Sequence, residues 1–174
     1  MLAVVPESIF RPTARILLVD DSERVMLYRG MGPTKNPEYA WFTPGGGVHP
    51  GESLPVAAAR ELREETGHDV SPDAFGPVVA RSSGYWRAAD DTLFRAEDSY
   101  FLLRVPALTV DVSGMEALER SLLDTFRWWT AAELDALDER VIPPGLAGLL
   151  RRLLAAGPPD EPVVLPWHRP EISP

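Results

Sequence analysis

The sequence contains no cysteine, which excludes a disulfide framework and any thiolate chemistry. It also lacks a long apolar run, and no stretch approaches the length that a membrane span requires. The N-terminal residues show neither the basic region nor the sustained apolar segment that is typical of a signal peptide. From these absences we expect a cytoplasmic protein with no membrane partner.

Basic side chains are scarce relative to acidic ones, because 17 Lys and Arg stand against 26 Asp and Glu, for a net charge of −9. General nucleic-acid binding depends on a basic surface, so we expect no nucleic-acid partner. A small phosphorylated substrate is still compatible with this charge, because a metal ion can supply positive charge locally.

Apolar residues are present in the proportion that one folded core needs. The 174 residues are 45% hydrophobic and 25% charged, which is typical of a globular domain. We expect one domain over residues 1–157, including a short N-terminal extension. The proline-rich tail over residues 158–174 is predicted to be extended or partly disordered.

Apolar patterning indicates a mixed α/β fold in which helices fall between groups of strands. The pattern predicts strands at 15–20, 24–29, 41–43, 78–86, 99–105 and 126–129, and helices at about 54–66, 115–123, 130–137 and 143–155. A turn at residues 20–23 indicates that the first two strands form a hairpin.

A glycine-rich loop at Gly46 leads into the predicted helix at 54–66, which carries Glu61, Glu64 and Glu65. Positions i, i+3 and i+4 share one helical face, so three carboxylates crowd together, at a cost of roughly 0.2–0.5 kcal/mol per like-charged pair. A divalent cation would convert this repulsion into binding energy, and hard oxygen ligands suit Mg²⁺ or Mn²⁺. A solvated helix face with Glu–Arg pairs is the alternative reading of this pattern taken alone.

The same helix carries start and stop signals. Ser53 is the expected N-cap, and Gly67 can end the helix in a left-handed conformation. A small apolar face consists of Ala58, Ala59 and Leu62. We expect this face to be buried while the glutamates point into an adjoining cleft.

Residues 46–67 resemble, position for position, the signature of the Nudix hydrolases. That signature is Gly, five residues, Glu, seven residues, then Arg-Glu-apolar-x-Glu-Glu-x-Gly-apolar, and its fixed positions here are Gly46, Glu52, Arg60, Glu61, Leu62, Glu64, Glu65 and Gly67. His68 departs from the pattern, since the family prefers an apolar residue there. The resemblance extends over roughly residues 13–156 and implies the Nudix fold, an α/β/α sandwich with a mixed β-sheet.

The resemblance also implies a chemistry, in which water attacks one phosphorus of a nucleoside diphosphate linked to another moiety. It implies Mg²⁺ or Mn²⁺ as the cofactor, with Glu65 or Glu61 as the base that takes the proton from water. Glu52 and Arg60 are expected to hold the helix and the loop in register. The metal ligands that the resemblance implies are the Gly46 carbonyl, Glu61, Glu64 and Glu65.

Many Nudix enzymes add a carboxylate from a loop late in the domain, and Glu116 and Glu119 are the candidates here. We favour Glu119, because it lies nearer the strand at 126–129 that should return the chain to the cleft. Both residues could instead be solvated positions on a short helix.

Substrate recognition is less closely specified by the sequence. Arg81, Tyr85 and Arg87 alternate along the strand predicted at 78–86 and are the candidate substrate-binding residues, although an exposed edge strand would show the same pattern. Several tryptophans are candidates for stacking on a base or for the core. The histidines His49, His68 and His168 show no metal-site spacing and are expected to be structural or exposed.

We therefore expect a pyrophosphohydrolase that acts on a nucleoside triphosphate or a nucleotide sugar. A dinucleoside polyphosphate is the alternative substrate, and Tyr85 resembles a tyrosine found in that subgroup. A non-catalytic module that senses a nucleotide is the rival from another functional class. Whether the chain forms a homodimer is left open.

Overall fold

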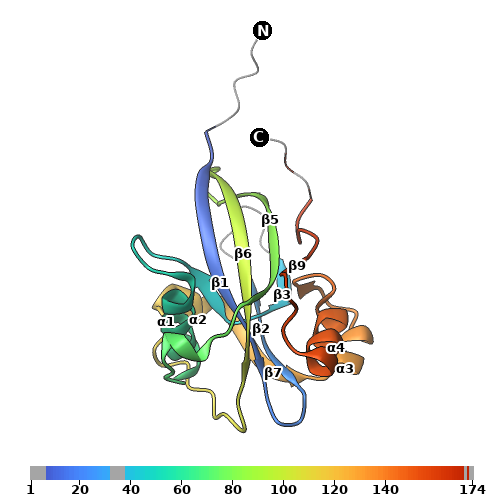
Figure 1. The fold of residues 1–174 in the computed structure, drawn as a ribbon. Helices are drawn as coiled ribbons and strands as arrows, with labels where there is room; N and C mark the ends of the chain where they lie inside the picture. Colours follow the sequence, from blue (N-terminus) through green and yellow to red (C-terminus); the bar gives the residue numbers. More distant parts are fainter. Residues whose placement is uncertain (1–6, 32–37, 171, 173–174) are drawn as a thin grey trace.

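The computed structural model describes residues 7–31, 38–170 and 172, and its centre is one mixed β-sheet (Figure 1). The strands are β1 (Ile9–Val19), β2 (Val25–Met31), β3 (Tyr39–Phe42), β4 (Gly45–Gly47), β5 (Val78–Arg87), β6 (Leu93–Arg104), β7 (Leu123–Trp129), β8 (Val141–Ile142) and β9 (Val163–Val164). The helices are α1 (Leu54–Thr66), α2 (Ala117–Leu122), α3 (Ala131–Asp135) and α4 (Leu146–Ala156), with a 3₁₀ turn at Pro72–Ala74. None of the helices in the described part of the chain is long and apolar enough to cross a membrane.

The sheet is organised around β1, which pairs with three other strands. Strand order is β8-β3-β2-β1-β6-β5-β9, with β4 added against β1 and β7 against β2. β1 runs parallel to β6 along its whole length, but it pairs with β2 at Val19 and Val25 and with β4 over Thr13–Arg15. Because β1 exchanges one partner for another along its length, β2 and β3 can separate from its N-terminal half.

Helices cover both faces of the sheet, with α1 and α2 on one side and α3 and α4 on the other (Figure 1). Alternate residues of β1 serve the two sides: Ile16 and Leu18 pack in the cluster that includes α1, and Leu17 and Val19 in the cluster that includes α4. The structure therefore confirms the expected α/β/α sandwich with a mixed sheet.

Helix α1 begins after Ser53 and ends before Gly67, as these capping residues indicated. The Ser53 side chain accepts a hydrogen bond from the Val56 amide, and Gly67 has a φ of 76°. The buried apolar side chains of α1 are Ala57, Ala58 and Leu62, whereas the expected Ala59 is only partly buried. The apolar face is therefore rotated slightly from the predicted one.

The sheet extends beyond the strands that the sequence predicted. β1 begins at Ile9 and β6 at Leu93, because their parallel pairing continues past the densest apolar runs. The three-residue strand β4 was not predicted at all. In the tail, Val163 and Val164 pair with β5 as strand β9, and Leu165 is buried. The domain boundary at residue 157 stays a prediction.

The hydroxyl of Tyr28 on β2 ties the sheet to α1, because it donates a hydrogen bond of 2.5 Å to the carbonyl oxygen of Glu65. Tyr28→Phe should lower the free energy of unfolding by about 1–2 kcal/mol, since it removes one buried hydrogen bond and leaves the carbonyl without this donor. Urea unfolding followed by circular dichroism measures the effect. Tyr39→Phe makes the same chemical change at an exposed tyrosine and should stay within about 0.5 kcal/mol of the wild type. Equal effects at the two positions would contradict a specific role for Tyr28.

Candidate active site

The glycines of β4 allow its backbone to lie between β1 and α1. Gly45 has a φ of +126°, and a Cβ there would lie 2.1 Å from the carbonyl oxygen of Ala14. A Cβ at Gly46 would lie 2.6 Å from Oε1 of Glu61. Residues with side chains cannot occupy these two positions without displacing the strand or the carboxylate.

Arg60 connects this loop to the acidic face of α1. Its Nε and Nη2 donate to the two carboxylate oxygens of Glu52, at 2.8 and 3.0 Å, and Nη2 also donates to the Gly47 carbonyl at 2.9 Å. Its Nη1 lies 2.8 Å from Oε1 of Glu61 and 3.4 Å from Oε2 of Glu64. One guanidinium therefore contacts three of the four glutamates in the motif.

The fourth glutamate, Glu65, is attached to the loop directly. Its Oε2 accepts a hydrogen bond of 2.7 Å from the Gly45 amide, and its side chain is buried, as is that of Glu61. Glu64 is more accessible, with 31% of its side chain exposed. The three carboxylates of the predicted metal site thus share one face of α1 but differ in their exposure.

The electrostatic effect of Arg60 is strongest on Glu52. Hydrogen bonds from Arg60 lower the pKa of Glu52 to about 2, with further contributions from the His49 amide and from the Arg60 charge. In turn, the hydrogen bonds to Glu52 and Glu61 and the charges of these carboxylates raise the pKa of Arg60. Glu52 and Arg60 therefore form a permanent ion pair at neutral pH.

The donor chemistry of this helix face suits a hard divalent cation, because it consists of carboxylate oxygens. Arg60 Nη1 lies between Glu61 and Glu64 and partly balances their charges. Within the residues that the structure describes, no three His, Asp or Glu side chains converge closely enough to hold an ion as they stand. In this arrangement the carboxylates are engaged by Arg60 and by the Gly45 amide. Metal ligation by Gly46, Glu61, Glu64 and Glu65 stays a prediction.

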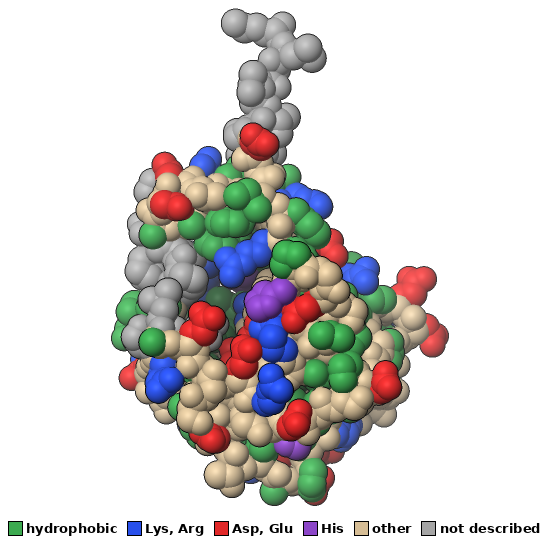
Figure 2. All heavy atoms as spheres, turned by 90° about the vertical axis from the view of Figure 1, so that its left-hand side faces the viewer, with side chains coloured by type: hydrophobic (Ala, Val, Ile, Leu, Met, Phe, Trp, Pro, Cys, Tyr) green, Lys and Arg blue, Asp and Glu red, His purple; other side chains and the backbone are tan. Residues whose placement is uncertain are grey.

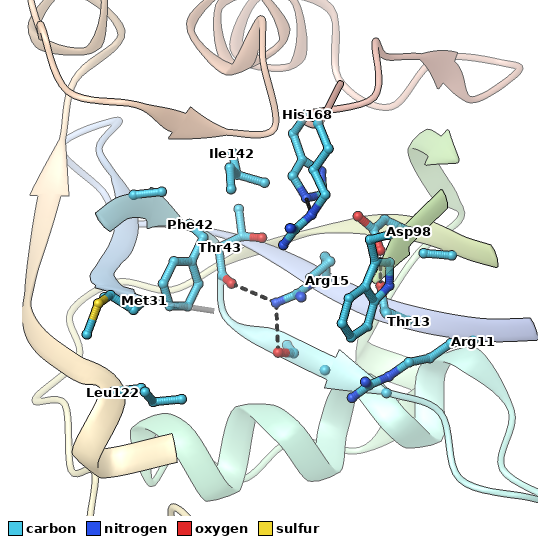
Figure 3. Close-up of a pocket in the computed structure, with 18 of the residues that line it drawn as sticks. Arg11, Thr13, Arg15, Met31, Phe42, Thr43, Asp98, Leu122, Ile142 and His168 are labelled. Carbon is cyan, nitrogen blue, oxygen red and sulfur yellow. Dashed lines mark hydrogen bonds between the residues drawn. The ribbon is translucent and has the colours of Figure 1, made fainter. Parts of the chain in front are cut away.

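A cavity of about 400 Å³ lies beside this helix face, where β3 separates from β1. Seen from the side of α1 and α2, the surface shows acidic and basic side chains interleaved beside a hollow (Figure 2). The cavity is lined by Arg11, Thr13 and Arg15 of β1, Ala40 and Phe42 of β3, Thr43, the β4 glycines, Glu65, Trp86, Asp98, Glu116, Arg140, Ile142 and Trp167, His168 and Arg169 of the tail, among others. The close-up shows Arg15 between the β4 loop and His168 (Figure 3).

Charged side chains of both signs line the cavity, namely Arg11, Arg15, Arg140 and Arg169 together with Glu38, Glu65, Asp98 and Glu116. Arg15 donates to the carbonyl oxygens of Thr43 and Gly45, at 3.3 and 2.9 Å, so its charge faces neutral partners. Burial lowers the pKa of Arg11, with a smaller contribution from the charge of Arg15. Burial likewise lowers the pKa of His168 to about 3, which leaves this imidazole neutral at neutral pH.

The structure brings only some of the candidate substrate-binding residues to the cavity. Arg81, Tyr85 and Arg87 are not among its lining residues, because alternation along β5 directs Trp86 to the cavity face instead. Substrate binding by these three side chains stays a prediction. The β5 side chain that lines the cavity is Trp86, one position along the strand from Tyr85.

The structure places only one of the two candidate late carboxylates, Glu116 and Glu119. Glu116, at the N-cap of α2, lines the cavity. Glu119 lies within α2, but its side chain is outside the described residues, so our preference for it stays a prediction. His168, expected to be structural or exposed, lines the cavity as well.

Sequence reasoning missed the arginines Arg11, Arg15, Arg140 and Arg169 and the tail residue Trp167. The only signal was the occurrence of large polar and aromatic side chains at 167–169 in an otherwise proline-rich tail. Arg15 began a predicted strand and Arg11 lay before it, and the pattern alone does not show that β1 extends to Ile9 and loses its neighbour there.

Comparisons with known proteins agree with this geometry. The family model that describes the NUDIX domain matches residues 9–152. The chain is 31% identical over 149 residues to an RNA pyrophosphohydrolase of Caulobacter vibrioides, and the match covers 76% of this chain and 77% of that protein.

Solved structures show the same fold at lower identity. The MutT protein of Methanosarcina mazei Go1 superposes with a TM-score of 0.60 at 18% identity, covering 86% of this chain and 96% of that one. An ADP-ribose pyrophosphatase of Streptococcus suis superposes with a TM-score of 0.55 at 16% identity, covering 88% and 96%.

The Glu52–Arg60 ion pair predicts a pH dependence of stability. The pKa of Glu52 is lower in the folded protein than its ordinary value of 4.5, so the stabilisation is complete above that value and is lost as pH falls towards 2. Glu52→Gln should therefore destabilise the protein at pH 7, and the difference from the wild type should shrink between about pH 5 and about pH 3. Urea unfolding across this range measures the difference.

The matched control is Glu161→Gln, which makes the same change at an exposed position. We expect it to stay within about 0.5 kcal/mol of the wild type at pH 7. A constant difference between Glu52→Gln and the wild type at every pH would refute the proposed linkage.

Proposed function

Because the chain belongs to the NUDIX domain family, we propose that it is a Mg²⁺- or Mn²⁺-dependent pyrophosphohydrolase that cleaves the pyrophosphate linkage of a small nucleotide derivative. The observation that carries this proposal is the position of the acidic face of α1. Glu65 ends this face at the wall of a cavity whose other walls carry arginines. An acidic helix face beside a cavity that also presents four arginines suits a phosphorylated substrate that binds with a metal ion.

Glu61, Glu64 and Glu65 would hold the metal, together with the Gly46 carbonyl. The bound cation would neutralise phosphate charge and lower the pKa of a water molecule. Arg60 must release Glu64 for this arrangement, and the long 3.4 Å contact between them is the weakest in its network. Glu52 and the Gly47 carbonyl would keep Arg60 in place after its contact with Glu64 is lost.

Glu65 is the better placed of the two candidate bases, because it lines the cavity while Glu61 is engaged by Arg60. In the proposed step its carboxylate takes the proton as the water oxygen bonds to phosphorus, and the bond from phosphorus to the bridging oxygen breaks. Of the late carboxylates, Glu116 lines the cavity and is our candidate for a supporting role. Glu119 stays the sequence-based alternative.

The size of the cavity supports a small substrate. About 400 Å³ lies within the range of small-molecule sites, and a nucleoside triphosphate or a nucleotide sugar matches its mixture of arginines and aromatic rings. A dinucleoside polyphosphate is the alternative. The cytoplasmic location, a homodimer and the absence of a membrane partner stay predictions.

A second candidate substrate is the pyrophosphate group of an RNA, which the name of the Caulobacter relative favours. The net charge of −9 opposes extended contacts with an RNA backbone, so only the phosphorylated end would be bound. A non-catalytic sensing module is less well supported, because every motif glutamate is present.

A hydrolysis panel separates these functions. We expect Mg²⁺- or Mn²⁺-dependent turnover of a nucleoside triphosphate or a nucleotide sugar, measured by phosphate release and chromatography, and no turnover in excess chelator. Dinucleoside polyphosphates and a 5′-triphosphorylated RNA belong on the same panel, because preferential cleavage of either would replace the preferred substrate. Tight nucleotide binding without turnover would favour the sensing module, and full activity in chelator would contradict the mechanism.

Removing one carboxylate of α1 should separate catalysis from folding. Glu64→Gln and Glu65→Gln should each lower kcat at least on the order of 10²-fold, comparable to the loss of other electrostatic stabilisers. In chelator, Glu64→Gln should melt at or slightly above the wild-type temperature, because like-charge repulsion on the helix falls. Glu161→Gln, at an exposed position, should keep wild-type turnover. Wild-type kcat in both α1 variants would exclude the helix from the chemistry.

A further inference from the structure

The C-terminal segment 163–169 lies beyond the residues that match the family model, yet it is built into the sheet. Val163 and Val164 pair with β5, and the Leu165 amide donates a hydrogen bond of 2.8 Å to the Arg81 carbonyl. Leu165 is buried in the cluster that includes α4. These contacts hold the segment along β5 and direct it to the cavity.

The Trp167 side chain packs against β5 at Gly84, where any residue with a Cβ would clash with it. A Cβ at Gly84 would lie 2.4 Å from the indole ring, so the ring occupies the space above the glycine. The indole Nε1 also donates to the Tyr85 carbonyl at 3.2 Å. The indole ring is therefore held both by close packing on Gly84 and by a hydrogen bond to the backbone of β5.

The residues after Trp167 bring positive charge to the cavity. Arg140 donates a hydrogen bond to the His168 carbonyl, and Arg169 donates from Nε to the His168 imidazole at 3.2 Å. The Arg169 guanidinium lies 5.6 Å from the centre of the Trp86 ring, and that of Arg11 lies 5.5 Å from it. Two arginines from opposite ends of the chain thus meet at one aromatic side chain.

The charge of Asp98 acts on both arginines, although this carboxylate also accepts a hydrogen bond from the Thr13 hydroxyl. In the described part of the chain Arg140 forms an ion pair with Glu38, whereas Arg11 and Arg169 form none. Burial lowers the pKa of both side chains, although Arg169 is half-buried and Arg11 is exposed. A guanidinium in either position can donate charge-assisted hydrogen bonds to a phosphate group.

We propose that the C-terminal segment completes the substrate site and that Arg169, together with Arg11, binds a phosphoryl group of the nucleotide beside Trp86. The proposal rests on the function proposed above, because it takes the bound anion to be part of the substrate. It adds that substrate affinity depends on a segment outside the matched domain. Arg169 would act in binding and not in the bond-breaking step.

Calorimetric titration with inorganic tripolyphosphate in excess chelator tests the binding without metal or turnover. We expect the wild type to bind this probe and Arg169→Gln and Arg11→Gln each to bind it about tenfold more weakly, as the loss of a charge-assisted hydrogen bond implies. Arg169→Lys should retain part of the affinity. The matched control is Arg152→Gln on the exposed side of α4, which should bind like the wild type. Equal affinity of Arg169→Gln and the wild type, or no binding to either, would overturn the proposal.

A second measurement tests whether docking of the segment matters. Trp167→Ala removes the indole from its seat on Gly84 and should weaken tripolyphosphate binding about as much as Arg169→Gln, because Arg169 then loses its anchor. On a substrate found in the panel, Arg169→Gln should raise KM about tenfold with kcat within about threefold of the wild type. An equal fall in kcat would assign Arg169 to the chemical step instead.

The two proposals fail separately. Loss of all hydrolysis on the panel would remove the proposed function but leave the tripolyphosphate result standing. Normal hydrolysis with unchanged binding and KM in Arg169→Gln would remove only the role of the segment.

Discussion

The structure of this site depends on one guanidinium that is surrounded by carboxylates. Arg60 contacts Glu52 through two nitrogens and reaches Glu61 and Glu64 with a third. Arginine suits this position because its donors are fixed in a planar fork and its charge persists at every physiological pH. Without it, the loop and the acidic helix would lose their common partner, and like charges on α1 would repel one another without compensation.

Despite the net charge of −9, the cavity presents four arginines together with four carboxylates. Three carboxylates share one face of α1, whereas Arg11 of β1 and Arg169 of the tail both lie beside Trp86 at the cavity. Arg15 joins the two regions, because it donates to the carbonyl oxygens of the loop that leads into β4. Charge is therefore distributed locally, and the total is a poor guide to what this cavity binds.

The comparisons with known proteins separate the domain from its C-terminal tail. The family match ends at residue 152, before the tail that supplies Trp167 and Arg169 to the cavity. The similar proteins carry different names, from an RNA pyrophosphohydrolase to an ADP-ribose pyrophosphatase, although the fold is shared. A common fold with different substrates is expected when the acidic helix is retained and the walls of the cavity vary.

Prediction from sequence was most successful where interactions are local. The bounds of α1, its Ser53 cap and its Gly67 end follow from residues close together in the chain, and the structure confirms them. Side chains on strands were harder to place: the sequence pointed to Tyr85, whereas the cavity takes its neighbour Trp86. A strand alternates at every residue, so its phase is decided by the strands that flank it.

The sequence by itself determined the family, the fold class and the acidic helix, because these are encoded in a short motif and in the order of apolar segments. Only the tertiary structure decided which side chains line the cavity. Arg11 and Arg169 come from opposite ends of the chain, and no local pattern can show that the pairing of β1, β5 and β9 brings both to Trp86.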